Sequence, residues 1–103
     1  MTADFVLSPH AIDDLHHLWL YLNQHAGAET ADRVEDEIFS LFAELARMPG
    51  IGHRRADLTS RPVLFSPIYS YLIVHQPVAK PLVIHAVLHG ARDVENVLKQ
   101  RAF

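Results

Sequence analysis

Apolar residues recur three to four positions apart in the first half of the chain and about two apart in the second half. The first spacing is typical of amphipathic helices and the second of strands. Ahead of the helices, residues 4–7 alternate and predict a short opening strand. Ser8-Pro9 then favours a helix start, because serine caps free amides and proline suits the first helical position.

Two helices are predicted before residue 50. The first ends at Gly27, a residue type common at helix ends, and the second runs from about Glu29 to Arg47. Their short connection favours an antiparallel two-helix hairpin. Each helix carries one apolar stripe that we expect to be buried. The stripes are Ile12, Leu15, Leu18, Trp19 and Leu22, and then Ala31, Val34, Ile38, Leu41, Phe42 and Leu45.

Three strands and a short helix are predicted after residue 60. The strand-like runs are 63–65, 69–75 and 82–89, with breaks expected at Ser66-Pro67 and at residues 76–81. Their close spacing favours antiparallel pairing. The tail, residues 91–101, predicts a short helix with Val94, Val97 and Leu98 turned inward.

These elements predict a single α+β domain over residues 1–103, in the order strand, helix, helix, three strands, short helix. Burying both helical stripes requires that the hairpin pack on one face of a mostly antiparallel sheet. The other face is then expected to be less covered and available for binding.

Composition narrows the class of protein. The chain has 103 residues and no cysteine, which excludes disulfides and thiolate metal sites. We see no signal peptide, and no apolar run approaches the ~18 residues of a membrane span, so a soluble cytoplasmic protein is expected. The net charge is -3 and the pI about 6.2, whereas domains that grip nucleic acid often exceed pI ~9. Direct sequence-specific nucleic-acid binding is therefore not expected, although a local basic patch remains open.

The C-terminal third resembles a known family. The run VLHGARDVENVL, residues 87–98, is similar to the end of ParE-type toxins of the RelE/ParE superfamily, where a last strand leads into a His-Gly-Ala-Arg-Asp turn. LSPHAIDDL, HRRADL and YSYLIVHQP resemble that family's opening, basic loop and central strand, in the same order. The chain departs from the family at Ala86 and Ser70, which stand where arginine is common.

The resemblance implies the toxin of a type II toxin–antitoxin system. Such a toxin is bound and neutralised by a cognate antitoxin, ParD-like or similar, in a toxin–antitoxin hetero-oligomer. It inhibits or poisons DNA gyrase rather than acting as a catalyst, and it needs no cofactor. The candidate partner-binding residues are Arg54, Arg55, His89 and Arg92.

An alternative is a RelE-like, ribosome-dependent mRNA endonuclease. Attack by a 2′-hydroxyl needs a base, an acid and cations for the phosphate. The candidates are His85, His89, Tyr71 and Arg92, with Tyr69, Arg54, Arg55 and Arg61 nearby. His85 and His89 are four apart in a predicted strand and are expected on one face. The competing interpretation makes them polar positions on an exposed or antitoxin-covered face. A third alternative is a protein-interaction module without toxicity.

Two smaller patterns also have a plain structural interpretation. In the turn, Gly90 is expected to supply a backbone angle that other residues resist, and Arg92 to pair with Asp93 or Asp57. His10, Asp14 and His17 share one helical face. That face could hold a divalent metal, but a solvated polar face explains it as well, and no metal site is expected.

Overall fold

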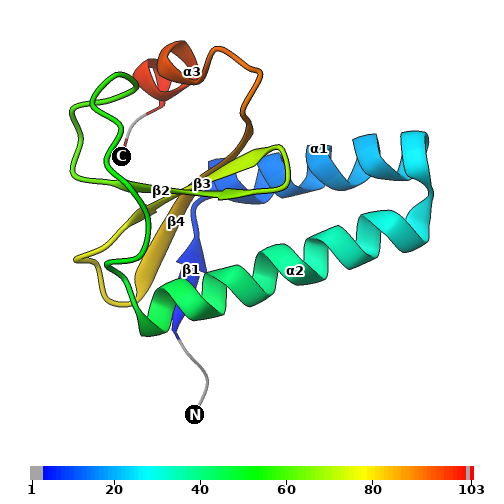
Figure 1. The fold of residues 1–103 in the computed structure, drawn as a ribbon, viewed down its shortest axis with the longest axis horizontal. Coiled ribbons are helices and arrows are strands. Elements are labelled where there is room, and N and C mark those ends of the chain that lie inside the picture. Colours follow the sequence, from blue (N-terminus) through cyan, green and yellow to red (C-terminus); the bar gives the residue numbers. More distant parts are fainter. Residues whose placement is uncertain (1–3, 102) are drawn as a thin grey trace.

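The computed structural model describes residues 4–101 and residue 103, and its elements follow the predicted order (Figure 1). The predicted domain also includes residues 1–3 and 102, which lie outside the described residues. The fold class is α+β, as predicted. The elements are β1 (Phe5–Leu7), α1 (Pro9–Ala26), α2 (Ala28–Arg47), β2 (Leu64–Ile68), β3 (Tyr71–Gln76), β4 (Leu82–His89) and α3 (Val94–Gln100).

The described strands form one mixed sheet in the order β1-β4-β3-β2. β1 is parallel to the start of β4, and the β4–β3 and β3–β2 pairings are antiparallel. β2 and β3 are joined by a tight turn at Tyr69 and Ser70, where Tyr69 has a positive φ of 53°. Tyr69 therefore belongs to the turn, and the third strand begins at Tyr71 rather than at residue 69.

The break predicted at Ser66-Pro67 is wrong, because both residues lie inside β2. β2 is at the edge of the sheet, and Pro67 is opposite Leu72 of β3. Proline is tolerated on an edge strand, since its missing N–H can face away from the ladder. The sequence alone does not distinguish such an edge proline from one that ends a strand.

The predicted boundaries of the first two helices are confirmed to within one residue, whereas the tail helix, Val94–Gln100, is shorter than the predicted segment 91–101. The Ser8 hydroxyl accepts a hydrogen bond from the Ala11 amide at 3.1 Å, and Pro9 is the first residue of α1. Gly27 separates the helices with a φ of 92°, a conformation that glycine adopts without strain. No helix in the described part of the chain is long and apolar enough to cross a membrane.

The helical hairpin covers one side of the sheet, which we call the hairpin face. Its core joins buried side chains of both helices to strand residues such as Ile73 and Ile84. The predicted stripe of α2 is confirmed at its central positions, since Ile38 and Phe42 are fully buried.

The predicted stripe of α1 is partly wrong. Ile12 is 54% exposed, and the buried positions beside it are Ala11 and Asp14. Trp19 is half-buried, and its indole N–H donates to Asp32 of α2 at 2.8 Å. The buried arc of α1 is therefore rotated toward Ala11, and the indole lies at its flank, where the N–H finds an acceptor.

The opposite side of the sheet, here the far face, is not the open surface that was expected. A second core forms there from strand residues such as Phe65, Val74 and Leu88 together with Val94 and Leu98 of α3. Leu58 of the loop between α2 and β2, residues 48–63, and the terminal Phe103 pack against this core. The loop and α3 lie together on that side of the sheet (Figure 1). The apolar residues of the tail are buried because they cover this face.

A β-bulge interrupts β4. Ile84 is opposite His75 and Ala86 is opposite Val74, which leaves His85 as the extra residue. A bulge breaks the alternation of side chains between the two faces. Ile84 accordingly belongs to the hairpin-face core, as does Val87, while Ala86 belongs to the far-face core.

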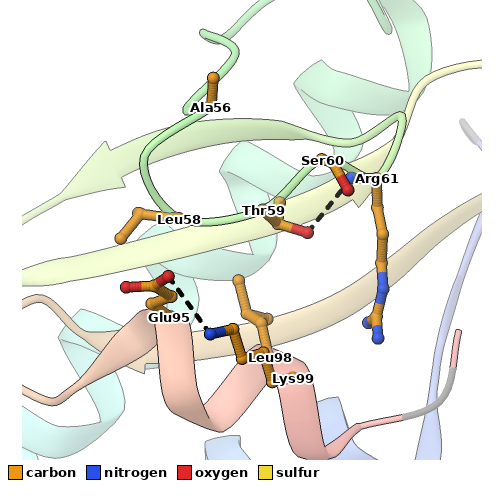
Figure 2. Close-up of a pocket in the computed structure, with 8 residues that line it drawn as sticks. All are labelled: Ala56, Leu58, Thr59, Ser60, Arg61, Glu95, Leu98 and Lys99. Carbon is orange, nitrogen blue, oxygen red and sulfur yellow. Dashed lines mark hydrogen bonds and ion pairs between the residues drawn. The ribbon is translucent and has the colours of Figure 1, made fainter.

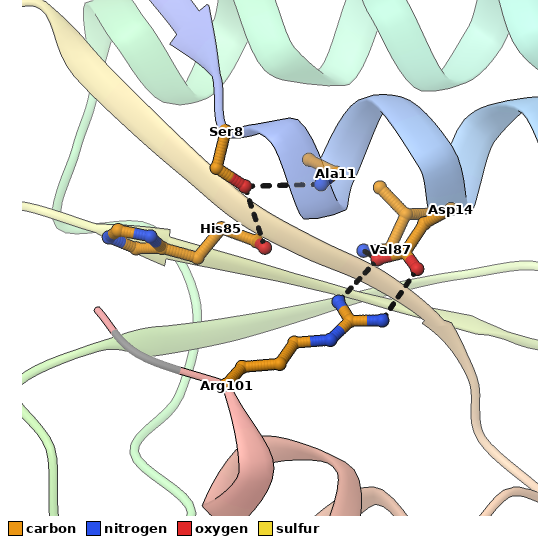
Figure 3. Close-up of polar contacts among 6 residues, drawn as sticks. All are labelled: Ser8, Ala11, Asp14, His85, Val87 and Arg101. Carbon is orange, nitrogen blue, oxygen red and sulfur yellow. Dashed lines mark hydrogen bonds and ion pairs between the residues drawn. The ribbon is translucent and has the colours of Figure 1, made fainter.

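The edge of β4 beyond β1 is satisfied by side chains of the α1 region (Figure 3). The Ser8 hydroxyl donates to the His85 carbonyl at 3.0 Å, and the Val87 amide donates to an Asp14 oxygen at 3.0 Å. The Arg101 guanidinium reaches the same carboxylate with contacts of 2.7 and 2.8 Å. Asp14 therefore joins α1, β4 and the segment after α3 into one buried cluster, which we call the Asp14 clamp.

Candidate functional site

A groove of about 520 Å³ lies between α1 and the ends of β3 and β4. We call it the α1–β4 groove. Leu18 and Val87 are its buried apolar residues. The remaining lining residues are polar or aromatic: Asp14, His17 and Tyr21 from α1, Tyr71 from β3, His89 from β4, and Arg92 from the following turn.

The local folds explain why these side chains meet. Asp14, Leu18 and Tyr21 follow each other by four and three residues, so they lie along one side of α1. Val87 and His89 are two apart in β4 beyond the bulge and share the hairpin face. Arg92 follows in the turn where β4 leads into α3, and its side chain also lines the groove.

Tyr71 and His89 pack together in the groove. Their rings lie edge to face with centroids 5.3 Å apart. Burial raises the pKa of Tyr71, and the neighbouring Tyr21 raises it further, so the phenol remains protonated at neutral pH. The His89 Nδ1 atom accepts from the Ala91 amide at 3.0 Å, which leaves Nε2 as the N–H donor of the neutral ring. Both groups therefore offer hydrogen-bond donors.

The ion pair predicted between Arg92 and Asp93 or Asp57 is not present among the described residues. Arg92 is exposed, and both carboxylates have other partners. Asp57 binds Arg55, and Asp93 caps α3 by accepting from the Asn96 amide at 3.3 Å. The guanidinium therefore stands at the groove without a carboxylate from the described chain.

Gly90 has a different role from the predicted one. It is absent from the glycines with positive φ, which are Gly27 and Gly52 among the described residues. Its amide instead donates to the Ser70 carbonyl at 2.7 Å, and a Cβ at this position would lie 3.4 Å from the same oxygen. Because 3.4 Å is an ordinary van der Waals distance, neither a special backbone angle nor a lack of room requires glycine here.

His85 does not join His89, so the predicted histidine pair is wrong. The bulge turns His85 to the far face, where its ring stacks on Phe103 with centroids 4.3 Å apart. Its Nε2 atom lies 3.0 Å from the Gln76 side-chain oxygen. Burial lowers the pKa of His85, and the charge of Arg61 lowers it further. His85 is a buried structural residue, remote from the groove.

The two arginines of the basic loop differ in their surroundings. Arg55 donates to both oxygens of Asp57, at 3.0 and 2.8 Å, and this pair is largely exposed. Arg55 and Arg92 line a neighbouring hollow of about 300 Å³. Arg54 is exposed and lines neither that hollow nor the groove. Of the predicted partner-binding residues, the structure brings together His89 and Arg92 in the groove, with Arg55 nearby.

A second hollow of about 300 Å³ lies on the far face, between the loop and α3 (Figure 2). Its two opposite charges, Glu95 and Lys99, pair with each other at 3.5 Å. The Arg61 guanidinium lies 4.2 Å from the centre of the Phe103 ring. None of the residues predicted for partner binding lines this hollow. It is therefore a weaker candidate for the functional surface.

The histidine face of α1 is not arranged for a metal. Asp14 is occupied by Arg101 and the Val87 amide, and His10 is exposed. In the part of the chain that the structure describes, no group of three or more histidine, aspartate or glutamate side chains is placed to hold an ion.

His17 and Tyr21 were missed as groove residues. Tyr21 is 54% exposed and stacks on His25 one turn later, with ring centroids 4.1 Å apart. An exposed aromatic residue next to the apolar stripe of α1 was the available signal, since aromatic residues are enriched in binding surfaces. His17 offered no signal that separates it from a solvated polar residue.

Comparison with known proteins gives a family and a fold. The family described as "ParE toxin of type II toxin-antitoxin system, parDE" matches residues 5–94 of the chain. A solved structure from the chromosomal ParDE toxin–antitoxin system of P. aeruginosa superimposes with a TM-score of 0.70 at 14% sequence identity. The match covers 85% of this chain and 96% of that one, and at this identity it bears on the fold alone. No curated protein sequence matches the chain.

Proposed function

This chain belongs to the ParE toxin family of type II toxin–antitoxin systems, and we propose that it poisons DNA gyrase and is neutralised by a cognate antitoxin. The family match over residues 5–94 is the observation that carries the proposal. The proposed site of action is the cytoplasm, where gyrase works.

The geometry supports a toxin that acts by binding rather than by catalysis. The predicted acid–base pair is divided between the two faces of the sheet, with His85 on one and His89 on the other. The net charge of -3 also disfavours gripping a nucleic-acid backbone without help from a partner protein. The α1–β4 groove combines buried apolar residues with hydrogen-bond donors, which suits the side chains of a bound peptide segment.

A supercoiling assay tests the gyrase proposal. Purified toxin at micromolar concentration is expected to inhibit supercoiling by gyrase or to stabilise its cleavage complex with DNA. Relaxation of the same plasmid by topoisomerase I should be unaffected, which controls for binding to DNA itself. Unimpaired supercoiling together with no stabilised cleavage complex would remove gyrase as the target.

The proposed antitoxin is ParD-like or similar and contains a segment that orders on the toxin. Segments of this kind bury large surfaces, on the order of 1,000–3,000 Å², because binding must also offset the entropy of ordering. Co-expression with the product of the adjacent gene should yield a stable hetero-oligomer on size exclusion. Failure of the two chains to co-purify would count against neutralisation by direct binding.

A ribosome-dependent endonuclease is the second candidate, favoured by one observation. The groove brings His17 of α1 to the same surface as His89, Tyr71 and Arg92, so two histidines and a cation line one cavity. If the protein cleaves mRNA, changing His17 and His89 to alanine should abolish cleavage and toxicity together. Intact transcripts during expression of the wild-type toxin would exclude this candidate.

A further inference from the structure

We propose that the α1–β4 groove binds a segment of the cognate antitoxin in which a large apolar side chain lies next to an aspartate or glutamate. The apolar side chain enters the groove and the carboxylate binds Arg92. This inference rests on the proposed neutralisation by an antitoxin, and it names the chemistry by which the antitoxin is recognised.

The interior of the groove favours an apolar side chain. Leu18 and Val87 are both at least 95% buried and form its apolar part, and Tyr71 is half-buried beside them. Tyr21 lines the groove while remaining 54% exposed, so an incoming side chain can cover it. Burying such surface contributes about 25 cal/mol per Å² of apolar area. Exposed aromatics beside buried aliphatic residues are typical of the anchor sites of protein interfaces.

The one carboxylate inside the groove does not compete for Arg92. Asp14 already accepts from the Val87 amide and from both terminal nitrogens of Arg101, at 3.0, 2.7 and 2.8 Å. Its negative charge is therefore matched by Arg101, and the described residues of the groove include no other carboxylate for a second guanidinium.

The acidic residues around the turn are occupied as well. Asp57 binds Arg55, Asp93 caps α3, and Glu95 pairs with Lys99. Among the described residues, the guanidinium of Arg92 is thus the charged group of this region that an outside carboxylate can pair with. A guanidinium can bind a carboxylate with two parallel hydrogen bonds, which gives both strength and orientation.

The same observations favour an antitoxin segment over a nucleic acid. A phosphate backbone would use Arg92 but not the apolar interior, and a chain with a net charge of -3 repels it. An acidic segment with an apolar anchor satisfies both parts of the groove at once.

Two charge-reversed toxins test the carboxylate. Arg92→Glu should weaken binding of fluorescently labelled antitoxin about tenfold or more, since it replaces an attraction at the groove by a repulsion. Arg47→Glu makes the same change of charge on an exposed residue at the end of α2, outside the groove, and it should alter affinity less than about twofold. Circular dichroism should be identical for both, because each residue is exposed.

Two substitutions of Tyr21 test the apolar part. Tyr21→Ala should lower the affinity for the antitoxin about tenfold, and Tyr21→Phe should retain most of that affinity because the ring remains. Changing single acidic residues of the antitoxin to arginine should identify one that restores binding to the Arg92→Glu toxin.

The outcomes separate this inference from the proposed function. If wild-type toxin binds the antitoxin and Arg92→Glu binds equally well, the groove chemistry is wrong and neutralisation stands. If wild-type toxin does not bind the antitoxin at all, the proposed neutralisation is wrong. If Arg92→Glu loses binding to a labelled single-stranded RNA but keeps the antitoxin, the groove is a nucleic-acid site and the inference is overturned.

Discussion

The two faces of the sheet are covered in different ways. On the hairpin face, two long helices bring regularly spaced apolar side chains onto the strands. On the far face, the cover consists of a loop, the seven-residue helix α3 and the terminal Phe103. These elements bury the strand residues without a regular spacing of apolar positions. Buried side-chain nitrogens without a partner occur on both sides among the described residues: Arg61 Nη1 and His85 Nδ1 on the far face, and Nδ1 of His75, whose other ring nitrogen contacts Pro49 after α2.

The two faces also differ in the surfaces that they offer to a partner. The far face is closed by short elements, and one of the hollows beside it holds a self-paired Glu95 and Lys99. The groove lies on the hairpin side, where α1 is next to the free end of β4, and it presents Arg92 without a partner from the described chain. We therefore regard the far face as structural and the hairpin side as the surface for partners.

The largest effect is expected in the core of the hairpin face. Phe42 is fully buried and packs edge to face on Phe5 and Phe39, with ring centroids 5.4 and 5.2 Å apart. Phe42→Ala should lower the free energy of unfolding by about 3–5 kcal/mol, measured by urea denaturation. Val78, which is 78% exposed, is the control, and Val78→Ala should change stability by less than about 0.5 kcal/mol. Equal effects of the two substitutions would refute the packing described here.

The Asp14 clamp is expected to be next, because it links the two sides of the molecule. Asp14→Ala leaves the largely buried Arg101 guanidinium and the Val87 amide without their acceptor, which should cost about 3 kcal/mol. The exposed pair of Glu95 and Lys99 is the matched control, and Glu95→Ala should cost less than about 0.5 kcal/mol. In the double variant of Asp14 and Arg101, the cost should be less than the sum of the single costs. Additive costs would mean that the two side chains do not interact in solution.

Phe103, which covers part of the far face, should contribute less to the free energy of unfolding than the Asp14 clamp does. Phe103 stacks on His85 and lies under the Arg61 guanidinium, but it is only half-buried. Phe103→Ala should cost about 1–2 kcal/mol, the range of a cation–π contact with some packing. It should also raise the pKa of His85 toward its ordinary value, since water then reaches the ring, and an NMR titration can follow this. An unchanged His85 titration would show that Phe103 does not cover the ring.

The smallest effect concerns pH. Burial lowers the pKa of both His75 and His85 below the ordinary 6.5. The unfolded chain therefore takes up protons first, so this contribution to stability is complete above about pH 6.5 and is lost as pH falls from there through the folded-state pKa values. Each histidine can contribute at most about 1.4 kcal/mol per pH unit.

One substitution separates the contribution of His85 on the far face to this pH dependence from that of His75. Between pH 7.5 and pH 5, the free energy of unfolding measured with urea should depend less steeply on pH in His85→Gln than in wild type, because one of the two buried histidines with a lowered pKa has been removed. A wild-type pH dependence in His85→Gln would mean that this imidazole titrates alike in the folded and unfolded states.

The predictability of the fold follows the same division. The helices could be predicted because Ser8, Pro9 and Gly27 act locally and the apolar spacing of α2 is regular. The cover of the far face could not, because it depends on long-range contacts of a loop and of Phe103 that have no periodic signature. The bulge at His85 also escaped, since nothing in the neighbouring residues marks a break in alternation.

The candidate site was half predictable. His89 and Arg92 belong to the family-like turn, and the structure places both in the groove. His85 was assigned to the same face by counting along a strand, which a single extra residue invalidates. His17 and Tyr21 come from α1, some 70 residues away in the chain, and only the tertiary fold brings them to the turn.

The most direct test of the functional division is NMR mapping of the antitoxin on isotope-labelled toxin. The amide and aromatic signals of Tyr21, Tyr71, His89 and Arg92 are expected to shift most, with those of Leu58 and Leu98 on the far face nearly unchanged. Shifts concentrated at Leu58, Leu98 and their neighbours would contradict the account, because they would place the partner on the face assigned here to structure alone.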